Sequence, residues 1–210
     1  MIPTKICGIT NLDDANVSVE NGASALGFIF YKKSPRAISI ENAKSISKQL
    51  SNTIIRVGVF VNHEKDFINE AISEVPLDMI QLHGDETPDF CNQFDVPILK
   101  ALHIKNEASL SVMDQYDVAV FLLDTFSNDK YGGTGETFDW SVLNQKFKTP
   151  IILSGGLNPK NIIDAIDAIN PSAVDVNSGV ESSPGKKDYN KLNSLFKNLN
   201  KTQSTGFQFG

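Results

Sequence analysis

The sequence lacks the features of secreted and membrane proteins. Only two of its 210 residues are cysteines, Cys7 and Cys91, and a lone disulfide is improbable in an unsecreted chain of this size. No apolar run approaches the ~20 residues that span a membrane. The start, MIPTKICGIT, has no basic segment followed by a long apolar stretch. We therefore expect a cytoplasmic protein with two thiols and no membrane contact.

Positive charge is scarce as well. Lysine and arginine number 19 against 25 acidic residues, which gives a formal net charge of -6 and a sequence pI near 5.0. The acids are scattered, so the chain has no basic patch that would attract nucleic acid or an anionic membrane. The partners that we expect are small molecules, with no nucleic acid.

The chain also has no low-complexity linker, no charge run and no obvious internal repeat between its halves. Its length and its 40% hydrophobic content allow one sizeable core and are a little short for two. We predict one domain over residues 1–200, followed by a polar tail, 201–210, with a frayed end.

What the sequence has is a series of eight short apolar runs. Helical segments alternate with them, and the spacing leaves room in each case for one strand, one helix and two short loops. The clearest helical segment is NPKNIIDAIDAI, in which Ile162, Ile166 and Ile169 share a face and Asn158 and Pro159 supply the N-cap and first position. The predicted strands begin at residues 4, 25, 55, 79, 98, 119, 150 and 173; the other predicted helices cover 12–21, 40–50, 64–75, 87–94, 108–116, 139–145 and 188–200.

Eight strand-helix units predict a compact (β/α)8 TIM barrel in the α/β class. The runs are almost continuously apolar, as expected of parallel strands that are covered on both faces. An open doubly wound sheet is the alternative. It would normally carry a G-x-G-x-x-G fingerprint after the first strand, and CGITNLDD has none.

The loops that follow the last two predicted strands are rich in glycine. SGGLNP and NSGVESSPG stand where barrels usually bind phosphate through backbone N–H groups and a short helix N-terminus. Glycine could instead serve only to make tight turns. Because both loops carry the pattern, we favour a phosphorylated small-molecule ligand.

Titratable side chains stand at the carboxyl ends of other predicted strands. Cys7 is either a core residue or a base at the barrel mouth, and Asp124 is either a functional acid or a loop-capping residue. Together they would form the acid-base pair that a proton-shuttling isomerase needs. Arg36, in SPRA, could bind a carboxylate in a bidentate manner or be a solvated loop cation.

Two further chemistries have weaker support. Three histidines, His63, His83 and His103, follow or end predicted strands, but neither H-x-H nor H-E-x-x-H spacing is present, and the sequence cannot show that they converge. We expect no metal. Lys100 could form a Schiff base, although no second feature supports that role.

Eight motifs between Lys5 and Asp188 together resemble the phosphoribosylanthranilate isomerase family of tryptophan biosynthesis, and they occur in the order that the family has. The combination of the first, fourth and sixth is highly specific, whereas SGGL alone is shared by many phosphate-binding barrels. The motifs are KICGIT, SPRAI, VGVFVN, QLHGDE, LLDT, GGTGETFDW, LSGGLNP and VDVNSGVESSPGKKD.

The resemblance implies an Amadori rearrangement without a cofactor. N-(5-phosphoribosyl)anthranilate would become 1-(2-carboxyphenylamino)-1-deoxyribulose 5-phosphate, with Cys7 as general base, Asp124 as general acid and Arg36 bound to the substrate carboxylate. For these roles Asp124 must be neutral and Cys7 ionised at the same pH. The site must therefore raise the pKa of Asp124 and lower the pKa of Cys7.

The resemblance also implies secondary site residues and leaves alternatives open. Ser154 and Asn177 depart slightly from the family pattern, and GGTG, 132–135, resembles a loop that closes over substrate. A related barrel of histidine biosynthesis, a second activity on that pathway's ribotide, a ligand-binding barrel without catalysis and a metal-dependent lyase remain alternatives, as do monomer and homodimer. The further residues implied to bind substrate are His83, Asp175, Gly156, Ser178 and Gly179.

Overall fold

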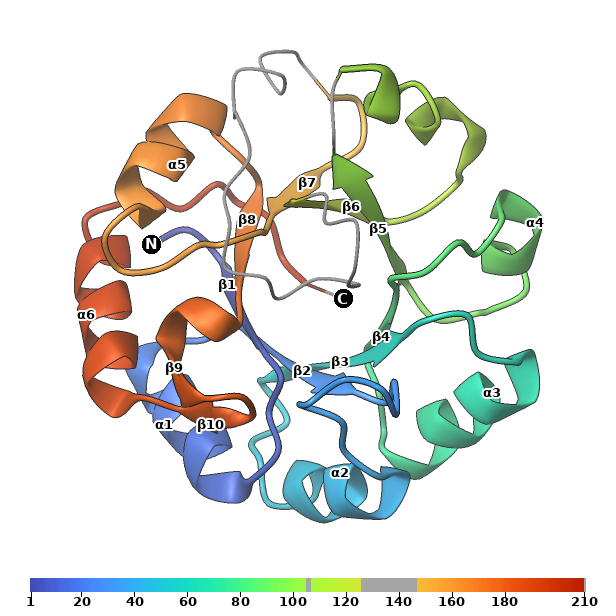
Figure 1. Ribbon diagram of the computed structural model, residues 1–210, viewed down its shortest axis with the longest axis horizontal. Helices are drawn as coiled ribbons and strands as arrows, with labels where there is room; N and C mark the ends of the chain where they lie inside the picture. The colour runs from blue at the N-terminus through green and yellow to red at the C-terminus, as the bar shows by residue number, and fades with distance from the viewer. Residues whose placement is uncertain (105–106, 126–146, 210) are drawn as a thin grey trace.

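The computed structural model describes residues 1–104, 107–125 and 147–209. Eight parallel strands form a closed barrel in which each strand pairs with the next in the sequence and the last pairs with the first (Figure 1). Closure excludes the open doubly wound sheet and confirms the predicted barrel. The strands are β1 (Thr4–Cys7), β2 (Ala25–Ile29), β3 (Ile55–Phe60), β4 (Met79–Leu82), β5 (Ile98–Ile104), β6 (Val120–Thr125), β7 (Ile151–Leu153) and β8 (Ala173–Val176).

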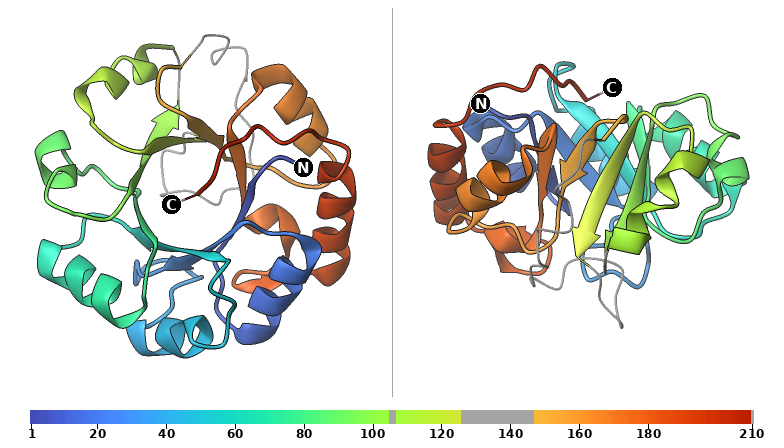
Figure 2. Two further views of the ribbon diagram at one scale, coloured as in Figure 1. Left: turned by 180° about the vertical axis from the view of Figure 1, so that it is seen from behind. Right: turned by 90° about the horizontal axis from the view of Figure 1, so that it is seen from above.

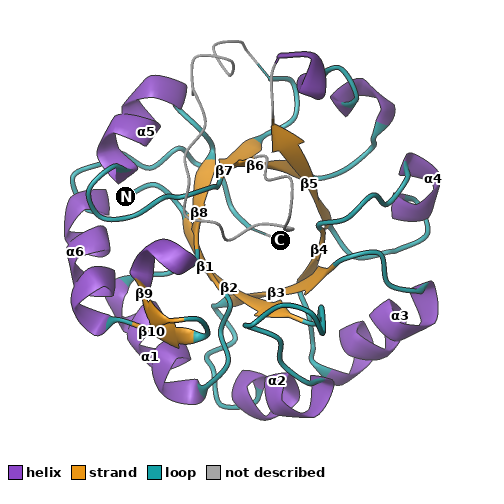
Figure 3. Ribbon diagram, in the orientation of Figure 1, coloured by secondary structure: helices purple, strands orange, loops and turns teal. Residues whose placement is uncertain are grey.

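Helices surround the barrel on the outside (Figure 3). Several have the ends that their sequences predict: Asn11 caps α1 by accepting a hydrogen bond from the Asp14 N–H, and Gly22 ends it in a left-handed conformation. The α-helices of the described residues are α1 (Leu12–Asn21), α2 (Ile40–Ser47), α3 (Lys65–Glu74), α4 (Pro88–Cys91), α5 (Ile162–Ile169) and α6 (Tyr189–Leu199). None of them is long and apolar enough to cross a membrane.

The alternation of side chains along the strands determines what faces the barrel interior. Every second residue of a strand faces the interior. On β5, Leu99 and Ala101 face inward, so His103 does too. On β6, Val120 and Leu122 face inward, so Asp124 does too. The carboxyl ends of the strands therefore direct polar side chains into one mouth, above an apolar interior layer.

Two helical predictions were wrong in detail. The segment predicted as a helix over 108–116 forms two short 3-10 segments, η1 (Glu107–Leu110) and η2 (Met113–Gln115). The N-cap position of helix α5 is Asn161, whose side chain makes no capping hydrogen bond, and not Asn158. The Asn158 side chain is used in the preceding turn, where it contacts the Gly156 carbonyl and the Lys160 N–H. The predicted helix 139–145 lies outside the described residues.

The loop after β8 contains elements that the sequence did not predict. A 3-10 segment, η4 (Ser178–Val180), is followed by a small antiparallel hairpin of β9 (Glu181–Ser183) and β10 (Lys186–Lys187). The hairpin leads directly into α6, whose N-cap is Asp188. Strands of two and three residues are too short to leave a hydrophobic pattern.

The C-terminal tail is not frayed. It crosses the end of the barrel opposite to the strands' carboxyl ends (Figure 2), where Phe209 is buried and Phe207 packs beside it. Their neighbours are residues at the beginnings of the strands, including Ala25, Met79 and Val120. The two phenylalanines close the apolar interior at this end, which the polar residues around them in the sequence had obscured.

Candidate active site

One cavity at the carboxyl ends of the strands brings together most of the predicted site. Its volume is about 530 Å³, and both proposed catalytic residues, Cys7 of β1 and Asp124 of β6, line it. Arg36, His83 and Asp175 line the same cavity from the β2–α2 loop, the end of β4 and β8. Five residues chosen from separate parts of the sequence thus face one space.

Cys7 is buried and closely packed. A Cβ atom added to Gly27 on the neighbouring strand would lie 2.7 Å from its Sγ, so glycine is needed there. Burial raises the pKa of the Cys7 thiol, and the nearby cations Lys5 and Lys187 only partly offset that effect. The direction is opposite to the lowered pKa that the sequence analysis required, because the strand end is more enclosed than the sequence suggested.

Lys5 provides a buried cation next to Cys7. Its Nζ donates to Asp175 Oδ1 at 2.8 Å across the β1–β8 pairing, and both side chains are buried. Burial lowers the pKa of Lys5, but the charges of Asp175 and Cys7 outweigh burial, and the pKa is raised overall. The sequence analysis missed Lys5, although a lysine inside an apolar strand was the available signal.

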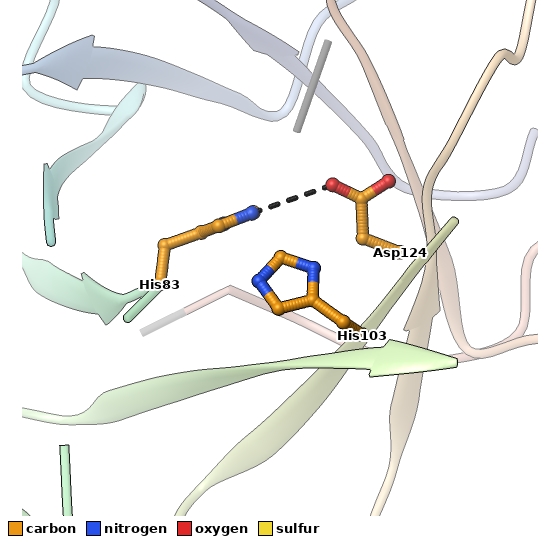
Figure 4. Close-up of side chains that lie close together, drawn as sticks. All are labelled: His83, His103 and Asp124. Carbon is orange, nitrogen blue, oxygen red and sulfur yellow. Dashed lines mark ion pairs between the residues drawn. The ribbon is translucent and has the colours of Figure 1, made fainter. Parts of the chain in front are cut away.

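Asp124 lies against two histidines (Figure 4). His83 Nε2 is 3.3 Å from Asp124 Oδ2, and His83 Nδ1 is 2.6 Å from Gln81 Nε2. The His103 ring centre lies 5.2 Å from that of His83. Burial, and secondly the neighbouring His83, lowers the pKa of His103.

Arg36 is held by a partner that the sequence analysis missed. Its Nε and Nη2 donate to both carboxylate oxygens of Glu181 at 2.7 to 3.0 Å. Three hydrogen bonds leave other guanidinium N–H groups for a ligand carboxylate, because the group carries five. Arg36 is therefore a buried, oriented group at the cavity wall and not a solvated loop cation.

Lys187 completes this cluster of charges. Its Nζ contacts Glu181 Oε1 at 3.1 Å and the carbonyl oxygen of Cys7 at 2.6 Å. Burial alone would raise the pKa of Glu181, but the hydrogen bond from Arg36 and the charge of Lys187 lower it overall. The hairpin after β8 thereby ties the Arg36 loop to the end of β1.

The two predicted phosphate loops lie against each other. A Cβ atom on Gly179 would lie 1.9 Å from the Leu157 carbonyl oxygen, so only glycine allows this approach. Within the described residues, however, the cavity is lined by Ser154, Asn177 and Pro184 of these loops and not by Gly156, Ser178 or Gly179. The GGTG segment, 132–135, lies outside the described residues.

Lys100 and His63, which were considered for a Schiff base and for metal binding, make contacts that support the fold. Lys100 Nζ donates to the carbonyl oxygens of Leu82 and Gly84 and to Glu86 Oε2, at 2.7 to 3.1 Å, so its three N–H groups are used. The ring of His63 stacks on Phe67 with centres 4.9 Å apart. Neither residue is among those that line the cavity in the described part of the chain.

A comparison with models of protein families shows to which family the chain belongs. The model described as N-(5'phosphoribosyl)anthranilate (PRA) isomerase matches residues 4–198. The chain belongs to this isomerase family. The family resemblance inferred from the motifs is therefore confirmed. The N-(5'-phosphoribosyl)anthranilate isomerase of Thermotoga maritima is 47% identical over 203 residues, with 94% of this chain and 98% of that protein covered.

Solved structures of the isomerase family share the fold. The Thermotoga maritima enzyme has a TM-score of 0.87 and 44% identity, covering 95% of this chain and 99% of that one. A family member in complex with reduced 1-(o-carboxyphenylamino)-1-deoxyribulose 5-phosphate has a TM-score of 0.83 and 42% identity, with the same coverage. Monomers generated from the dimeric Thermotoga maritima isomerase have a TM-score of 0.84 and 43% identity, again with 95% and 99% covered.

Proposed function

We propose that Asp124 and Cys7 act as the general acid and the general base of this isomerase. The chain is an enzyme of tryptophan biosynthesis that converts N-(5'-phosphoribosyl)anthranilate to 1-(2-carboxyphenylamino)-1-deoxyribulose 5-phosphate. The observation that carries the residue assignment is that both side chains, from β1 and β6, line one cavity. Proton transfers alone suffice for an Amadori rearrangement, so the proposal includes no cofactor.

The first step opens the sugar ring. Protonated Asp124 donates its proton to the furanose ring oxygen, the bond from that oxygen to C1 breaks, and the anthranilate nitrogen forms an iminium ion with C1. His83 Nε2 lies 3.3 Å from the Asp124 carboxyl group, and His103 lies beside the pair.

The second step removes the proton from C2. Cys7 first releases its thiol proton to solvent, and the resulting thiolate accepts the proton from C2. The electron pair of the broken C2–H bond forms the C1–C2 double bond of an enolamine, the C=N electrons return to the nitrogen, and the enolamine tautomerises to the ketone. Burial makes the thiolate costly in the resting site, but the positive iminium ion and Lys5 would both stabilise it. A raised pKa also makes the thiolate a stronger base once it forms.

The remaining contacts would position the two ends of the substrate. Arg36, oriented by Glu181, would bind the anthranilate carboxylate, while His83 and Asp175 contact the substrate between the ends. The backbone around Gly156, Ser178 and Gly179 would bind the phosphate. Either a monomer or a homodimer is compatible with this site, which is built within one chain.

Loss of anthranilate-type fluorescence from freshly prepared phosphoribosylanthranilate, in EDTA, tests the assignment. Cys7→Ser and Asp124→Asn should each lower turnover about 100-fold or more. Cys91→Ser and the exposed Asp167→Asn are matched controls that should retain activity. If either catalytic variant turns over like wild type, that residue is not the acid or base. An inert wild type would redirect the test to the histidine-pathway ribotide.

A further inference from the structure

Three metal-ligating side chains converge at the barrel mouth. His83, His103 and Asp124 each offer one ligand atom, and the three atoms lie within 4.8 Å of one another. They come from the ends of the neighbouring strands β4, β5 and β6, and His103 is paired with Asp124 in the register of β5 and β6. Figure 4 shows the two rings and the carboxylate turned toward a common space.

Two imidazoles and one carboxylate are a typical ligand set for Zn²⁺. Zinc binds histidine nitrogen and carboxylate oxygen at about 2.0–2.2 Å and leaves a fourth position open in sites with three protein ligands. Small rotations of the three side chains would bring their ligand atoms to these distances from one ion. The open position would face the cavity that His83 and Asp124 line.

Gln81 provides the outer contact that a histidine ligand of zinc usually has. Its side-chain amide lies 2.6 Å from His83 Nδ1, and within the described structure Gln81 Oε1 is enclosed without a hydrogen-bond partner, while His83 Nε2 faces Asp124 Oδ2 at 3.3 Å. If the amide turns by half a rotation, Oε1 accepts the Nδ1–H of His83. The lone pair of Nε2 is then directed at the ligand cluster.

The charges around the cluster do not oppose a cation. Lys100 is neutralised by Glu86 at 3.0 Å, and Lys5 by Asp175 at 2.8 Å. Asp124 supplies a negative charge inside the cluster itself. A divalent ion would therefore meet an anionic ligand and two paired lysines.

We propose that His83, His103 and Asp124 bind Zn²⁺ at the barrel mouth and that bound Zn²⁺ inhibits the isomerase. Zinc and a proton compete for the carboxylate of Asp124, so a carboxylate held by zinc cannot protonate the sugar ring. The inhibition rests on the proposed role of Asp124, whereas the binding does not.

Calorimetric titration of untagged, EDTA-stripped protein with ZnCl₂ tests the binding. Wild type should bind one ion, and His103→Asn and His103→Gln should bind it about 100-fold more weakly. His63→Asn is the matched control, because His63 stacks on Phe67 outside the cluster, and it should bind like wild type. Wild-type affinity in both His103 variants, with circular dichroism confirming that they fold, overturns the proposal.

The Co²⁺ complex separates this site from binding at the Cys7 thiol. We expect visible bands of nitrogen and oxygen coordination without a thiolate-to-cobalt charge-transfer band, and unchanged Zn²⁺ affinity in Cys7→Ser. A charge-transfer band, or loss of binding in Cys7→Ser, assigns the metal to the thiol and contradicts the proposal.

Initial rates over a series of Zn²⁺ concentrations test the inhibition, each variant being compared with its own rate in EDTA. Wild type and His63→Asn should be inhibited together and recover in EDTA, and the His103 variants should need about 100-fold more Zn²⁺. Full activity with zinc bound would refute the inhibition. An enzyme without activity in EDTA would refute the proposed function, while the calorimetry would still decide the metal site.

Discussion

A single lysine determines much of the electrostatics around Cys7. Burial raises the pKa of this thiol, and Lys5 is the first of the groups that lower it again. The pairing of Lys5 with Asp175 across β1 and β8 holds the ammonium group in place. An arrangement of this kind stabilises a thiolate when it forms.

Replacing Lys5 with methionine should therefore raise the pKa of Cys7 further. We expect the pH profile of alkylation by iodoacetamide to move to higher pH, with Cys7→Ser as the blank. Burial raises the pKa of Cys91 to about 11, so this second thiol contributes little at lower pH. Because Lys5→Met leaves Asp175 buried without its partner, the double variant Lys5→Met/Asp175→Asn is measured beside it. An unchanged profile in both would remove Lys5 from this role.

Glu181 should stabilise the fold in a pH-dependent way. Its folded-state pKa is lowered, so its contribution is fully present above the unfolded value, near 4.5, and is lost as the pH falls through the folded pKa. At pH 7, Glu181→Gln should lower the free energy of unfolding by about 3–5 kcal/mol, because Arg36 and Lys187 lose their buried partner. The difference from wild type should shrink in acid.

Urea denaturation at pH 7 and at successively lower pH measures this effect. Glu74→Gln is the control, since Glu74 pairs with Lys44 on the surface, where an ion pair contributes little. A Glu181→Gln variant as stable as wild type at pH 7 would show that Arg36 and Lys187 do not depend on this carboxylate.

The sequence pointed to residues that line the cavity, but not to the residues that pair with them. Cys7, Asp124 and Arg36 could be chosen because each ends or follows a strand or belongs to a recognisable motif. Glu181 is 145 residues away from Arg36 in the chain, and no local pattern reports a contact over that separation. The cluster of His83, His103 and Asp124 was hidden for the same reason, because each ligand comes from a different strand.

At the scale of elements, the strands were more predictable than the helices. Six of the eight strands begin at the predicted residue, and β6 and β7 begin one residue later. Strands buried on both faces leave continuous apolar runs, whereas a helix depends on caps and periodicity. The segment 108–116 contains Ser109 and Ser111, and serine is a residue type that favours turns over helix interiors; the segment forms 3-10 turns instead.

The contact between the loops after β7 and β8 gives a prediction at this scale. Gly179→Ala would place a Cβ atom 1.9 Å from the Leu157 carbonyl oxygen, so the two loops would have to separate. If these loops bind the phosphate, the KM for phosphoribosylanthranilate should rise about tenfold or more, with a smaller change in kcat. Steady-state kinetics measure both constants.

Gly206→Ala is the control for that variant. Unlike Gly179, Gly206 has a left-handed conformation, with φ of +76°, but no atom of the described residues lies within 4 Å of an added Cβ. It should keep the wild-type KM. An unchanged KM in Gly179→Ala would mean that the phosphate binds away from this contact.

The two ends of the barrel differ in the side chains that they carry. Polar side chains gather at the carboxyl ends of the strands, where Cys7 and Asp124 line the cavity. At the opposite end the C-terminal tail crosses the barrel (Figure 2), and there Phe209 is buried and Phe207 packs against the same apolar cluster. The proposed catalytic residues and the tail residues that close the interior thus lie on opposite sides of one apolar layer, as is usual in barrels of this type.

Because of this separation, we expect that a substitution in the tail can lower the free energy of unfolding without lowering kcat/KM. Phe209→Ala should remove about 3 kcal/mol from the free energy of unfolding, because it empties a buried position in the apolar cluster that includes Ala25, Met79 and Val120. At a temperature where the variant stays folded, its kcat/KM should equal that of wild type, since the cavity lies at the other end of the barrel. Urea denaturation and steady-state kinetics provide the two measurements.

Gln208→Ala is the matched control, because Gln208 is exposed between the two phenylalanines. It should leave both stability and activity unchanged. Loss of stability in both variants would mean that the tail acts through its backbone and not through the Phe209 side chain. A lower kcat/KM in fully folded Phe209→Ala would show that the apolar layer transmits strain from the closed end to Cys7 and Asp124, and the two ends would then not be independent.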